Sequence, residues 1–196
     1  MRISIRTVIV TALLMLGAVQ KAGAQNEFAL KTNLLHDATA SFNLAAEYAV
    51  ASKWTIQLEG AVRLFDAYDI TLNHWLVRPE MRYWLCESYN GFFISGYAMT
   101  GMATVGRLWD FSPVYYRFPN LKNFLLKDAT LVSAGLGIGY DWILGRHWNL
   151  EAAFSLGYMF VQGDEYHTED DTPLLTGSIF DYTGPTGLSL SIVYLF

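Results

Sequence analysis

Hydrophobic and polar side chains alternate with a period of two along most of the chain that follows residue 25. The clearest example is Gly187–Phe196, where large apolar side chains occupy every second position and mostly glycine and serine lie between them. Such alternation places successive side chains on opposite faces of a β-strand. It predicts eight strands: Phe28–Leu35, Phe42–Val50, Trp54–Leu64, His74–Cys86, Phe92–Val105, Thr130–Trp142, Trp148–Phe160 and Gly187–Phe196. A weak helical stripe is confined to Asn120–Lys127.

The charged residues indicate which face of these strands is inside. They share the polar face of their strands: Lys31, Glu47, Glu59, Arg63, Arg78, Glu80, Arg82, Asp141 and Glu151. The opposite face is bulky and aromatic, and an eight-stranded barrel has little interior room. The glycines on the polar face suit a narrow lumen: Gly135, Gly137, Gly139 and Gly157. We therefore predict an all-β fold, an eight-stranded antiparallel transmembrane β-barrel (an up-and-down meander of the OmpA or OmpX kind) with its charges inside.

Two points stay open at this stage. A soluble, lipocalin-like barrel would instead turn its apolar face inward. In Phe92–Val105 the alternation permits either Tyr97 and Met99 or Phe92 and Ile94 to face the lumen.

The connections between the predicted strands alternate between tight and longer ones. Ala51–Lys53, Glu87–Asn90 and Leu144–His147 are tight, and they alternate with Asp37–Ser41, Phe65–Asn73, Gly106–Asp128 and Gly163–Thr183. Outer-membrane barrels have short periplasmic turns and longer external loops, so we expect both termini to be periplasmic. Aromatic residues near the tight-turn end predict a girdle at one membrane interface: Trp54, Tyr83, Trp142, Trp148, Tyr194 and Phe196. We expect the bacterial barrel assembly machinery to recognise the terminal Phe196.

The N-terminal segment has the features of a secretory signal peptide. Arg2 and Arg6 precede the apolar run Thr7–Val19, and Ala22 and Ala24 are small residues at the positions that signal peptidase reads. We expect cleavage after Ala24, which divides the chain into a signal peptide (1–24) and an outer-membrane barrel domain (25–196). A membrane-anchoring helix is the less favoured alternative, because the apolar run is short.

Composition excludes several other classes of protein. The chain is 53% hydrophobic and 16% charged, against about 25% charged in soluble domains, and this excludes intrinsic disorder. The formal charge of −5 disfavours a nucleic-acid partner. After the N-terminus no stretch of about 18 uncharged apolar residues predicts a helical membrane span. Cys86 is the only cysteine, so no intrachain disulfide can form, and we expect a small buried hydrophobic side chain there.

The predicted interior charges form the first candidate site. Charged groups cannot remain unpaired in a narrow, poorly hydrated lumen, so we expect a salt-bridged network that fills it. Its members are Lys31, Glu47, Glu59, Arg63, Arg78, Glu80, Arg82 and Glu151. The alternative is a path for protons or ions, although the near balance of signs argues against a selective pore.

The two longest predicted loops form the second candidate site. In Gly106–Asp128 the candidate binding residues are Trp109, Tyr115, Tyr116 and Arg117, which suit a surface protein or lipopolysaccharide. Alternatively, the strands extend here and the aromatic residues pack together. Gly163–Thr183 carries six acidic residues and no Lys or Arg. Its spacing matches no EF-hand, so we expect a solvated acidic loop, with no metal site and no cofactor.

Enzyme chemistry has weak candidates in His36 and His74. Some eight-stranded outer-membrane barrels modify lipid A with His and Ser or Asp residues near the outer rim. Asp37 and Ser41 lie close to His36 in the chain, and Asp69 lies close to His74. General-base catalysis would require a histidine within hydrogen-bond reach of a nucleophile.

Three blocks of sequence resemble a known family. Lys31–Leu35, His74–Glu87, and Trp142–Gly145 with Trp148–Ala152 are similar to the family named domain of unknown function 3575 (DUF3575). The resemblance covers nearly all of the chain after the signal peptide, with two small departures at His36 and Arg78. It implies a small outer-membrane barrel of gut and oral anaerobes and no catalytic residue. For some members it implies a link to surface fimbriae or adhesins.

These observations predict a small, non-catalytic outer-membrane barrel with a filled polar interior. It would act as a membrane scaffold or as a surface-interaction protein through residues 106–128 and 163–183. The expected partners are outer-membrane lipid, lipopolysaccharide and a surface or fimbrial protein. The alternative is a lipid-A-modifying outer-membrane enzyme.

Overall fold

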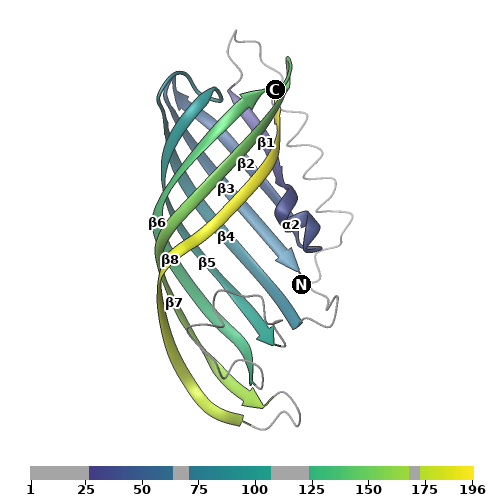
Figure 1. Ribbon diagram of the computed structural model, residues 1–196, viewed down its shortest axis with the longest axis vertical. Helices are drawn as coiled ribbons and strands as arrows, with labels where there is room; N and C mark the ends of the chain where they lie inside the picture. Colours follow the sequence, from purple (N-terminus) through teal and green to yellow (C-terminus); the bar gives the residue numbers. More distant parts are fainter. Residues whose placement is uncertain (1–26, 64–70, 107–123, 168–172) are drawn as a thin grey trace, which may run out of the picture.

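The computed structural model describes residues 27–63, 71–106, 124–167 and 173–196. They form eight antiparallel β-strands and one short helix (Figure 1). The strands are β1 (Phe28–Asn33), β2 (Phe42–Ala51), β3 (Trp54–Arg63), β4 (Thr71–Trp84), β5 (Gly91–Gly106), β6 (Phe124–Ile143), β7 (Trp148–His167) and β8 (Pro173–Leu195). The helix, α2 (Leu34–Ala38), follows β1. Within these ranges no helix has both the length and the apolar composition needed to cross a membrane.

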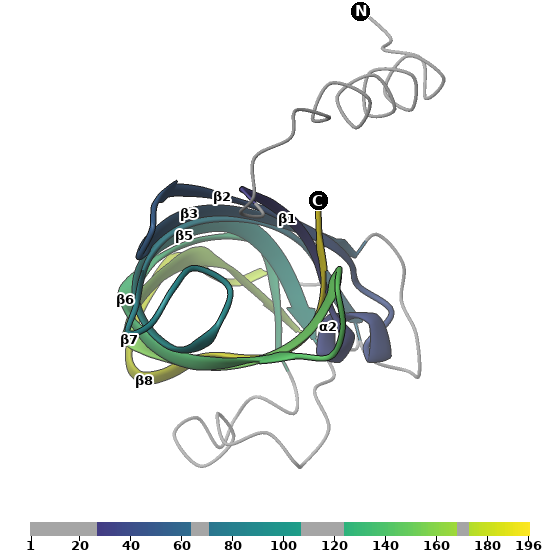
Figure 2. The same cartoon turned by 90° about the horizontal axis from the view of Figure 1, so that it is seen from above.

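The strands pair in chain order, and the sheet closes on itself. Each strand pairs antiparallel with the next, and β1 pairs with β8 from Ala29 opposite Leu195 to Asn33 opposite Ser191. Viewed end-on, the strands form a ring (Figure 2). The prediction of eight antiparallel strands in one sheet is therefore confirmed.

Two ends of the sheet can be distinguished. The tight turns at residues 52–53, 85–90 and 144–147 lie at one end, which we call the tight-turn end. The predicted positions of these turns are confirmed to within about two residues. The opposite end, which we call the loop end, carries α2 between β1 and β2.

Several predicted boundaries were wrong. β1 ends at Asn33 instead of Leu35, because the Asn33 side-chain oxygen accepts hydrogen bonds from the backbone N–H groups of Leu35 (3.1 Å) and Leu190 (3.2 Å) and caps α2. The weak helical stripe was misleading, because Phe124–Lys127 begins β6.

The predicted loop Gly163–Thr183 is largely strand. Backbone pairing between β7 and β8 continues through Met159 opposite Tyr182 and Gly163 opposite Ser178. The alternation of hydrophobic and polar residues fades here although the strands go on. Hydrophobic alternation records burial on one face, whereas backbone hydrogen bonding does not depend on it.

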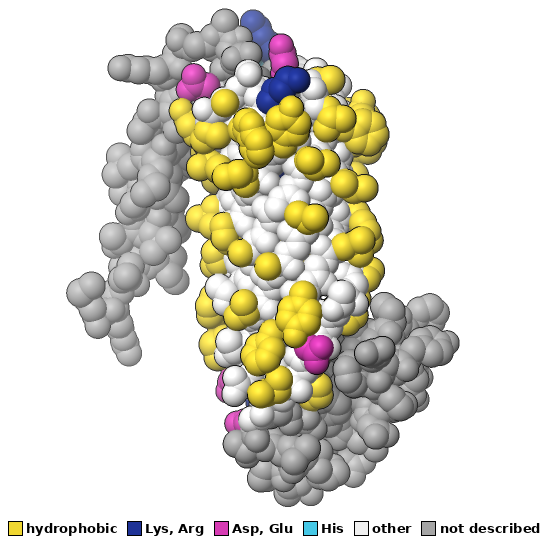
Figure 3. Space-filling model, turned by 90° about the vertical axis from the view of Figure 1, so that its left-hand side faces the viewer, with side chains coloured by type: hydrophobic (Ala, Val, Ile, Leu, Met, Phe, Trp, Pro, Cys, Tyr) yellow, Lys and Arg dark blue, Asp and Glu magenta, His cyan; other side chains and the backbone are white. Residues whose placement is uncertain are grey.

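Polar side chains point inward and large apolar side chains point outward. Glu47 has no exposed surface, whereas Leu136 is 72% and Leu188 is 65% exposed. The inward set also includes Lys31, Arg63, Glu80, Arg82, Asp141 and Glu151, and Glu59 and Arg78 are half-buried. In β5 Tyr97 is buried and Phe92 is exposed, which resolves the ambiguous register. Exposed large hydrophobic side chains lie along the outer wall, as the face in Figure 3 shows, and we call this set of side chains the apolar belt.

Aromatic rings cluster at the tight-turn end of the apolar belt. Ring centroids lie 4.9 Å apart for Trp54 and Tyr83, for Trp148 and Tyr194, and for Tyr194 and Phe196. Cys86 lies in the turn at residues 85–90 and is exposed. The expectation of a buried cysteine was wrong, because β4 ends at Trp84 and the chain leaves the sheet before Cys86.

Candidate functional site in the barrel interior

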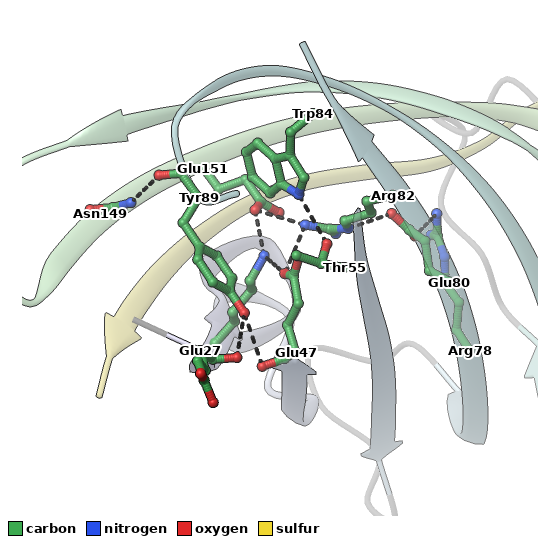
Figure 4. Close-up of polar contacts among 11 residues, drawn as sticks. Glu27, Glu47, Thr55, Arg78, Glu80, Arg82, Trp84, Tyr89, Asn149 and Glu151 are labelled. Atoms are coloured by element: carbon green, nitrogen blue, oxygen red, sulfur yellow. Dashed lines mark hydrogen bonds and ion pairs between the residues drawn. The ribbon is translucent and has the colours of Figure 1, made fainter. Parts of the chain in front are cut away.

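The candidate site begins where four strands bring opposite charges together inside the barrel. The Lys31 ammonium on β1 lies 2.5 Å from Glu151 Oε2 on β7 and also pairs with Glu47 on β2. Arg82 Nη1 on β4 contacts the same Glu151 oxygen at 2.8 Å and Glu47 Oε2 at 3.3 Å. All four side chains are buried, so solvent hardly screens these ion pairs (Figure 4).

The network continues along β4 on the same inward face. Arg82 Nε lies 2.8 Å from Glu80 Oε1, and Arg78 Nη2 lies 3.0 Å from Glu80 Oε2. Arg78 Nη2 also donates to Ser155 Oγ on β7 at 2.7 Å. Residues two apart on a strand face the same side, which explains the spacing of these three charges. We call the six residues the ion-pair layer: Lys31, Glu47, Arg78, Glu80, Arg82 and Glu151.

The ion-pair layer contains three cations and three carboxylates, so its formal charge is zero. Burying an isolated charge is very costly, and pairing with additional hydrogen bonds offsets that cost. Each of the six side chains contacts at least one member of opposite sign. The layer is therefore compatible with a narrow interior without a bound counter-ion.

An aromatic cluster, which we call the aromatic floor, lies between the ion-pair layer and the tight-turn end. It consists of Trp84, Tyr89 and Phe93, with ring centroids of Trp84 4.8 Å from Phe93 and 5.9 Å from Tyr89. The guanidinium carbon of Arg82 lies 4.5 Å from the centre of the Phe93 ring, so floor and layer are in contact. Seen end-on, the turn between β4 and β5 overlies the centre of the barrel (Figure 2).

Tyr89 holds this turn in place. Its hydroxyl donates toward the backbone oxygens of Glu27 (3.2 Å) and Glu47 (3.3 Å), and its own carbonyl accepts from the Asn149 side chain at 2.9 Å. Its backbone is left-handed, with φ of 64°, which is unusual for a bulky residue. Burial, reinforced by the nearby negative charge of Glu47, raises the pKa of the Tyr89 hydroxyl far above its ordinary range. Tyr89 therefore remains neutral at physiological pH.

Glycines on β6, the strand that pairs with β5, leave room for the inward side chains of β5. A Cβ atom placed on Gly139 would lie 2.7 Å from Phe93 Cε1 and 2.8 Å from the backbone oxygen of Ala152. At Gly137 it would lie 2.5 Å from Ser95 Oγ. The rings and hydroxyls of β5 thus occupy the space that side chains on β6 would need.

A cavity of about 180 Å³ lies on the loop side of the ion-pair layer. Its lining comes from β1, β2, β3, β4, β5, β7, β8 and α2, and it includes His36, Gln57, Glu59, Arg78 and Glu80.

The structure brings six of the eight predicted network residues into the ion-pair layer. Glu59 lies outside the layer and lines the cavity, and Arg63 is buried on β3 opposite His74. The sequence did not single out Trp84, although it continues the alternation of Glu80 and Arg82 and could have been found that way. Tyr89 carried no such signal, because it lies in a turn.

The structure does not bring the histidine candidates together. His36 lies on α2 and His74 on β4, and the strand order places β2 and β3 between β1 and β4. The Ser41 hydroxyl contacts Thr39 Oγ1 at 3.3 Å, while His36 Nδ1 is buried without a partner. Within the described residues, His36 Nδ1 therefore has no serine or threonine hydroxyl as a hydrogen-bond partner. Asp69 lies outside the described residues.

The loop candidates are mostly beyond the described ranges. These include Trp109, Tyr115, Tyr116 and Arg117, and also the acidic residues Glu169, Asp170 and Asp171. Asp164 accepts a hydrogen bond from the backbone N–H of Gly177 at 2.7 Å. In the described part of the chain, no group of three or more His, Cys, Asp or Glu side chains is arranged to hold a metal ion.

Comparison with known proteins agrees with the resemblance seen in the sequence. The family model described as "Protein of unknown function (DUF3575)" matches residues 8–196. A comparison with curated proteins finds no match. The match covers all eight strands and every residue of the ion-pair layer.

Proposed function

The chain belongs to the family of proteins of unknown function DUF3575, and from this premise we propose that it is an outer-membrane β-barrel that acts without catalysis. Its filled interior makes it a membrane scaffold, and its loop end serves as a surface for interaction with another protein or with lipopolysaccharide. We further propose that residues 1–24 are a signal peptide and that both termini of the mature chain are periplasmic.

One observation carries the membrane proposal, namely the inverted distribution of side chains. Large apolar residues such as Leu136 and Leu188 are exposed around the sheet, while Glu47 and Glu151 are buried within it. In water, an apolar wall of this extent would be unfavourable, and large apolar patches mark surfaces that contact membrane or protein. A closed antiparallel sheet also satisfies the backbone hydrogen bonds that lipid cannot. The aromatic rings at the tight-turn end suit a membrane interface.

The filled interior supports a structural role over transport. The ion-pair layer joins side chains of β1, β2, β4 and β7, the aromatic floor packs against Arg82, and the layer carries balanced charge. A selective pore would need an open path and a ring of one sign. The lengths of β6, β7 and β8 support a surface role, because these strands of 20 to 23 residues exceed the roughly 10 that a bilayer crossing requires.

Surface interaction would involve residues 106–128 and the extended β7–β8 hairpin. The hairpin replaces the acidic loop expected from the sequence. The lipid-A-modifying enzyme remains the less supported alternative, since no observation places His36 or His74 beside a nucleophile.

Cysteine labelling in intact cells tests the membrane topology. Native Cys86 is exposed at the tight-turn end, and Thr39 is exposed at the loop end. A membrane-impermeant maleimide should label Thr39→Cys in a Cys86→Ser background, and it should label native Cys86 only after the outer membrane is permeabilised. Labelling of Cys86 in intact cells, or recovery of the protein in the periplasm without detergent, would refute the proposal.

Planar-bilayer recording tests the filled interior. The purified protein should show no sustained conductance, and sustained conductance would mean that the ion-pair layer does not block the lumen.

Mass spectrometry tests the signal peptide and the enzyme alternative. The mass of the mature chain should correspond to a start at Gln25. Profiling lipid A by mass spectrometry in a strain carrying His36→Ala and His74→Ala should show unchanged lipids, and an altered profile would support the enzyme instead.

A further inference from the structure

Glu59 is a carboxylate without a partner inside the barrel. It lies directly opposite Arg78, on the neighbouring strand, and both side chains line the cavity on the loop side of the ion-pair layer. Arg78 nevertheless pairs with Glu80 and Ser155, and its guanidinium carbon lies 4.1 Å from the centre of the Tyr97 ring. Within the described residues the Glu59 carboxylate has no ion pair and no hydrogen bond, although Arg78 lies directly opposite it.

Three further polar atoms in the same cavity have no partner. Gln57 is 94% buried, and its side-chain oxygen Oε1 accepts no hydrogen bond. His36 Nδ1 and Arg78 Nε are likewise buried and unpartnered among the described residues. All three side chains line the cavity together with Glu59.

Three unpartnered buried atoms on residues around one cavity call for an explanation. Native proteins leave few buried polar atoms without partners, because each one loses its hydrogen bonds to water. Buried unpartnered oxygens also occur on Glu47, Asp141 and Asn149, but these residues do not line the cavity. The unpaired groups around the cavity are therefore available to a second molecule that enters it.

The donor and acceptor types define the chemistry of that molecule. The Glu59 carboxylate and Gln57 Oε1 can only accept hydrogen bonds, which suits an ammonium group with three N–H donors. Arg78 Nε can only donate, which suits a carboxylate oxygen. The volume of about 180 Å³ corresponds to about six water molecules at ~30 Å³ each, and so limits the ligand to a few heavy atoms.

We propose that this cavity binds a small zwitterion of the amino-acid type, with its ammonium group on Glu59 and Gln57 and its carboxylate on Arg78. The ligand enters from the loop end, because the ion-pair layer and the aromatic floor close the other side. This binding site goes beyond the scaffold and surface roles proposed above, and it does not depend on membrane insertion.

Nuclear magnetic resonance of the ¹⁵N-labelled protein in detergent micelles tests the proposal. Titration with glycine or alanine should shift the Arg78 Nε and Gln57 side-chain signals in a saturable manner. Methylammonium and acetate, which each carry half of the ligand's charge, should bind at least about tenfold more weakly, because each loses one charge-assisted interaction. Equal binding of methylammonium and glycine would exclude the zwitterion, and saturation by none of these probes would overturn the site.

Matched variants identify the carboxylate that carries the site. Glu59→Gln should weaken glycine binding by about tenfold or more, whereas Glu87→Gln, at an exposed position of the opposite end, should leave it unchanged. Since Glu59 has no partner, its replacement should not lower resistance to urea. Unchanged binding by Glu59→Gln would overturn the proposal. If this variant fails to fold, the saturable shifts of Arg78 Nε and Gln57 in the unmodified protein still decide the question.

Discussion

Asp141 on β6 lies directly opposite Glu151 on β7, and both carboxyl side chains are buried inside the barrel. Glu151 is held by Lys31 and Arg82. Neither carboxylate oxygen of Asp141 has a hydrogen-bond partner among the described residues. Like charges that face each other across a strand pair are destabilising. Asp141 is therefore an unfavourable charge in the interior.

Asp141→Asn should stabilise the barrel. The amide keeps the shape of the side chain and removes the repulsion from Glu151, so we expect the free energy of unfolding to rise by about 1 kcal/mol. Urea titration of the protein folded into lipid vesicles measures this change. Asp128→Asn, the same substitution at an exposed position, should have almost no effect. A loss of stability in Asp141→Asn would show that Asp141 has a partner that favours its charge.

Arg82→Met should destabilise the barrel severely. Arg82 contacts Glu47, Glu80 and Glu151, and removing one partner of a buried ion pair costs about 3–5 kcal/mol. Arg146→Met, at an exposed turn position, is the matched control and should behave like the unmodified protein in the same urea titration.

A second substitution distinguishes lost charge balance from lost packing in the same layer. Adding Glu151→Gln to Arg82→Met removes one of the unbalanced carboxylates. The double variant should be more stable than Arg82→Met alone. If the two effects simply add, the network does not act through charge compensation.

Gly139→Ala should disturb the packing of Phe93. The added methyl group would contact both the Phe93 ring and the backbone of β7, and overpacking of this kind costs about 1–3 kcal/mol. Gly145→Ala is the control, because a Cβ there meets no atom within 4 Å. Replacing the Phe93 ring by a smaller side chain, Phe93→Leu, should recover part of the lost stability in the Gly139→Ala background. No recovery would mean that the backbone contact dominates.

Leu136→Arg should impair insertion into lipid vesicles. Leu136 is among the most exposed large apolar residues, in the middle of the apolar belt on β6. Arginine facing lipid near the bilayer midplane costs about 2–4 kcal/mol. Measured by urea titration in vesicles, the loss should exceed that of Leu144→Arg, an exposed leucine in the tight turn at residues 144–147. Equal effects at the two positions would contradict a membrane-facing belt.

The burial of Tyr89 should lower the free energy of unfolding at high pH. The pKa of the Tyr89 hydroxyl is raised in the folded protein. Below about pH 10, near the pKa of tyrosine in the unfolded chain, both states keep the proton and the free energy of unfolding is unaffected. Above about pH 10 only the unfolded chain releases the proton, so the free energy of unfolding falls. The urea midpoint should fall between about pH 10 and 11, and the fall should be smaller in Tyr89→Phe. Tyr158→Phe, at an exposed position on β7, should keep the fall of the unmodified protein. Identical pH profiles for all three proteins would contradict the inferred burial of the Tyr89 proton.

Part of this site could be predicted from the sequence. Charges spaced two apart, such as Arg78, Glu80 and Arg82, share a face of any strand, and the narrowness of an eight-stranded barrel indicates that this face is inside. The sequence could not show that Arg78 pairs with Glu80 and leaves Glu59 free, because the choice depends on rotamers and on Ser155 from another strand.

The amino-acid sequence by itself determined the number of strands and which charged side chains share a face, because alternation is a local property of the extended backbone. Only the tertiary structure decided which charges meet. Lys31 and Glu151 are 120 positions apart, and they pair because closure between β1 and β8 brings β7 close to β1. The ends of β7 and β8 were likewise decided by pairing between strands, since backbone hydrogen bonds continue where the hydrophobic pattern has ended.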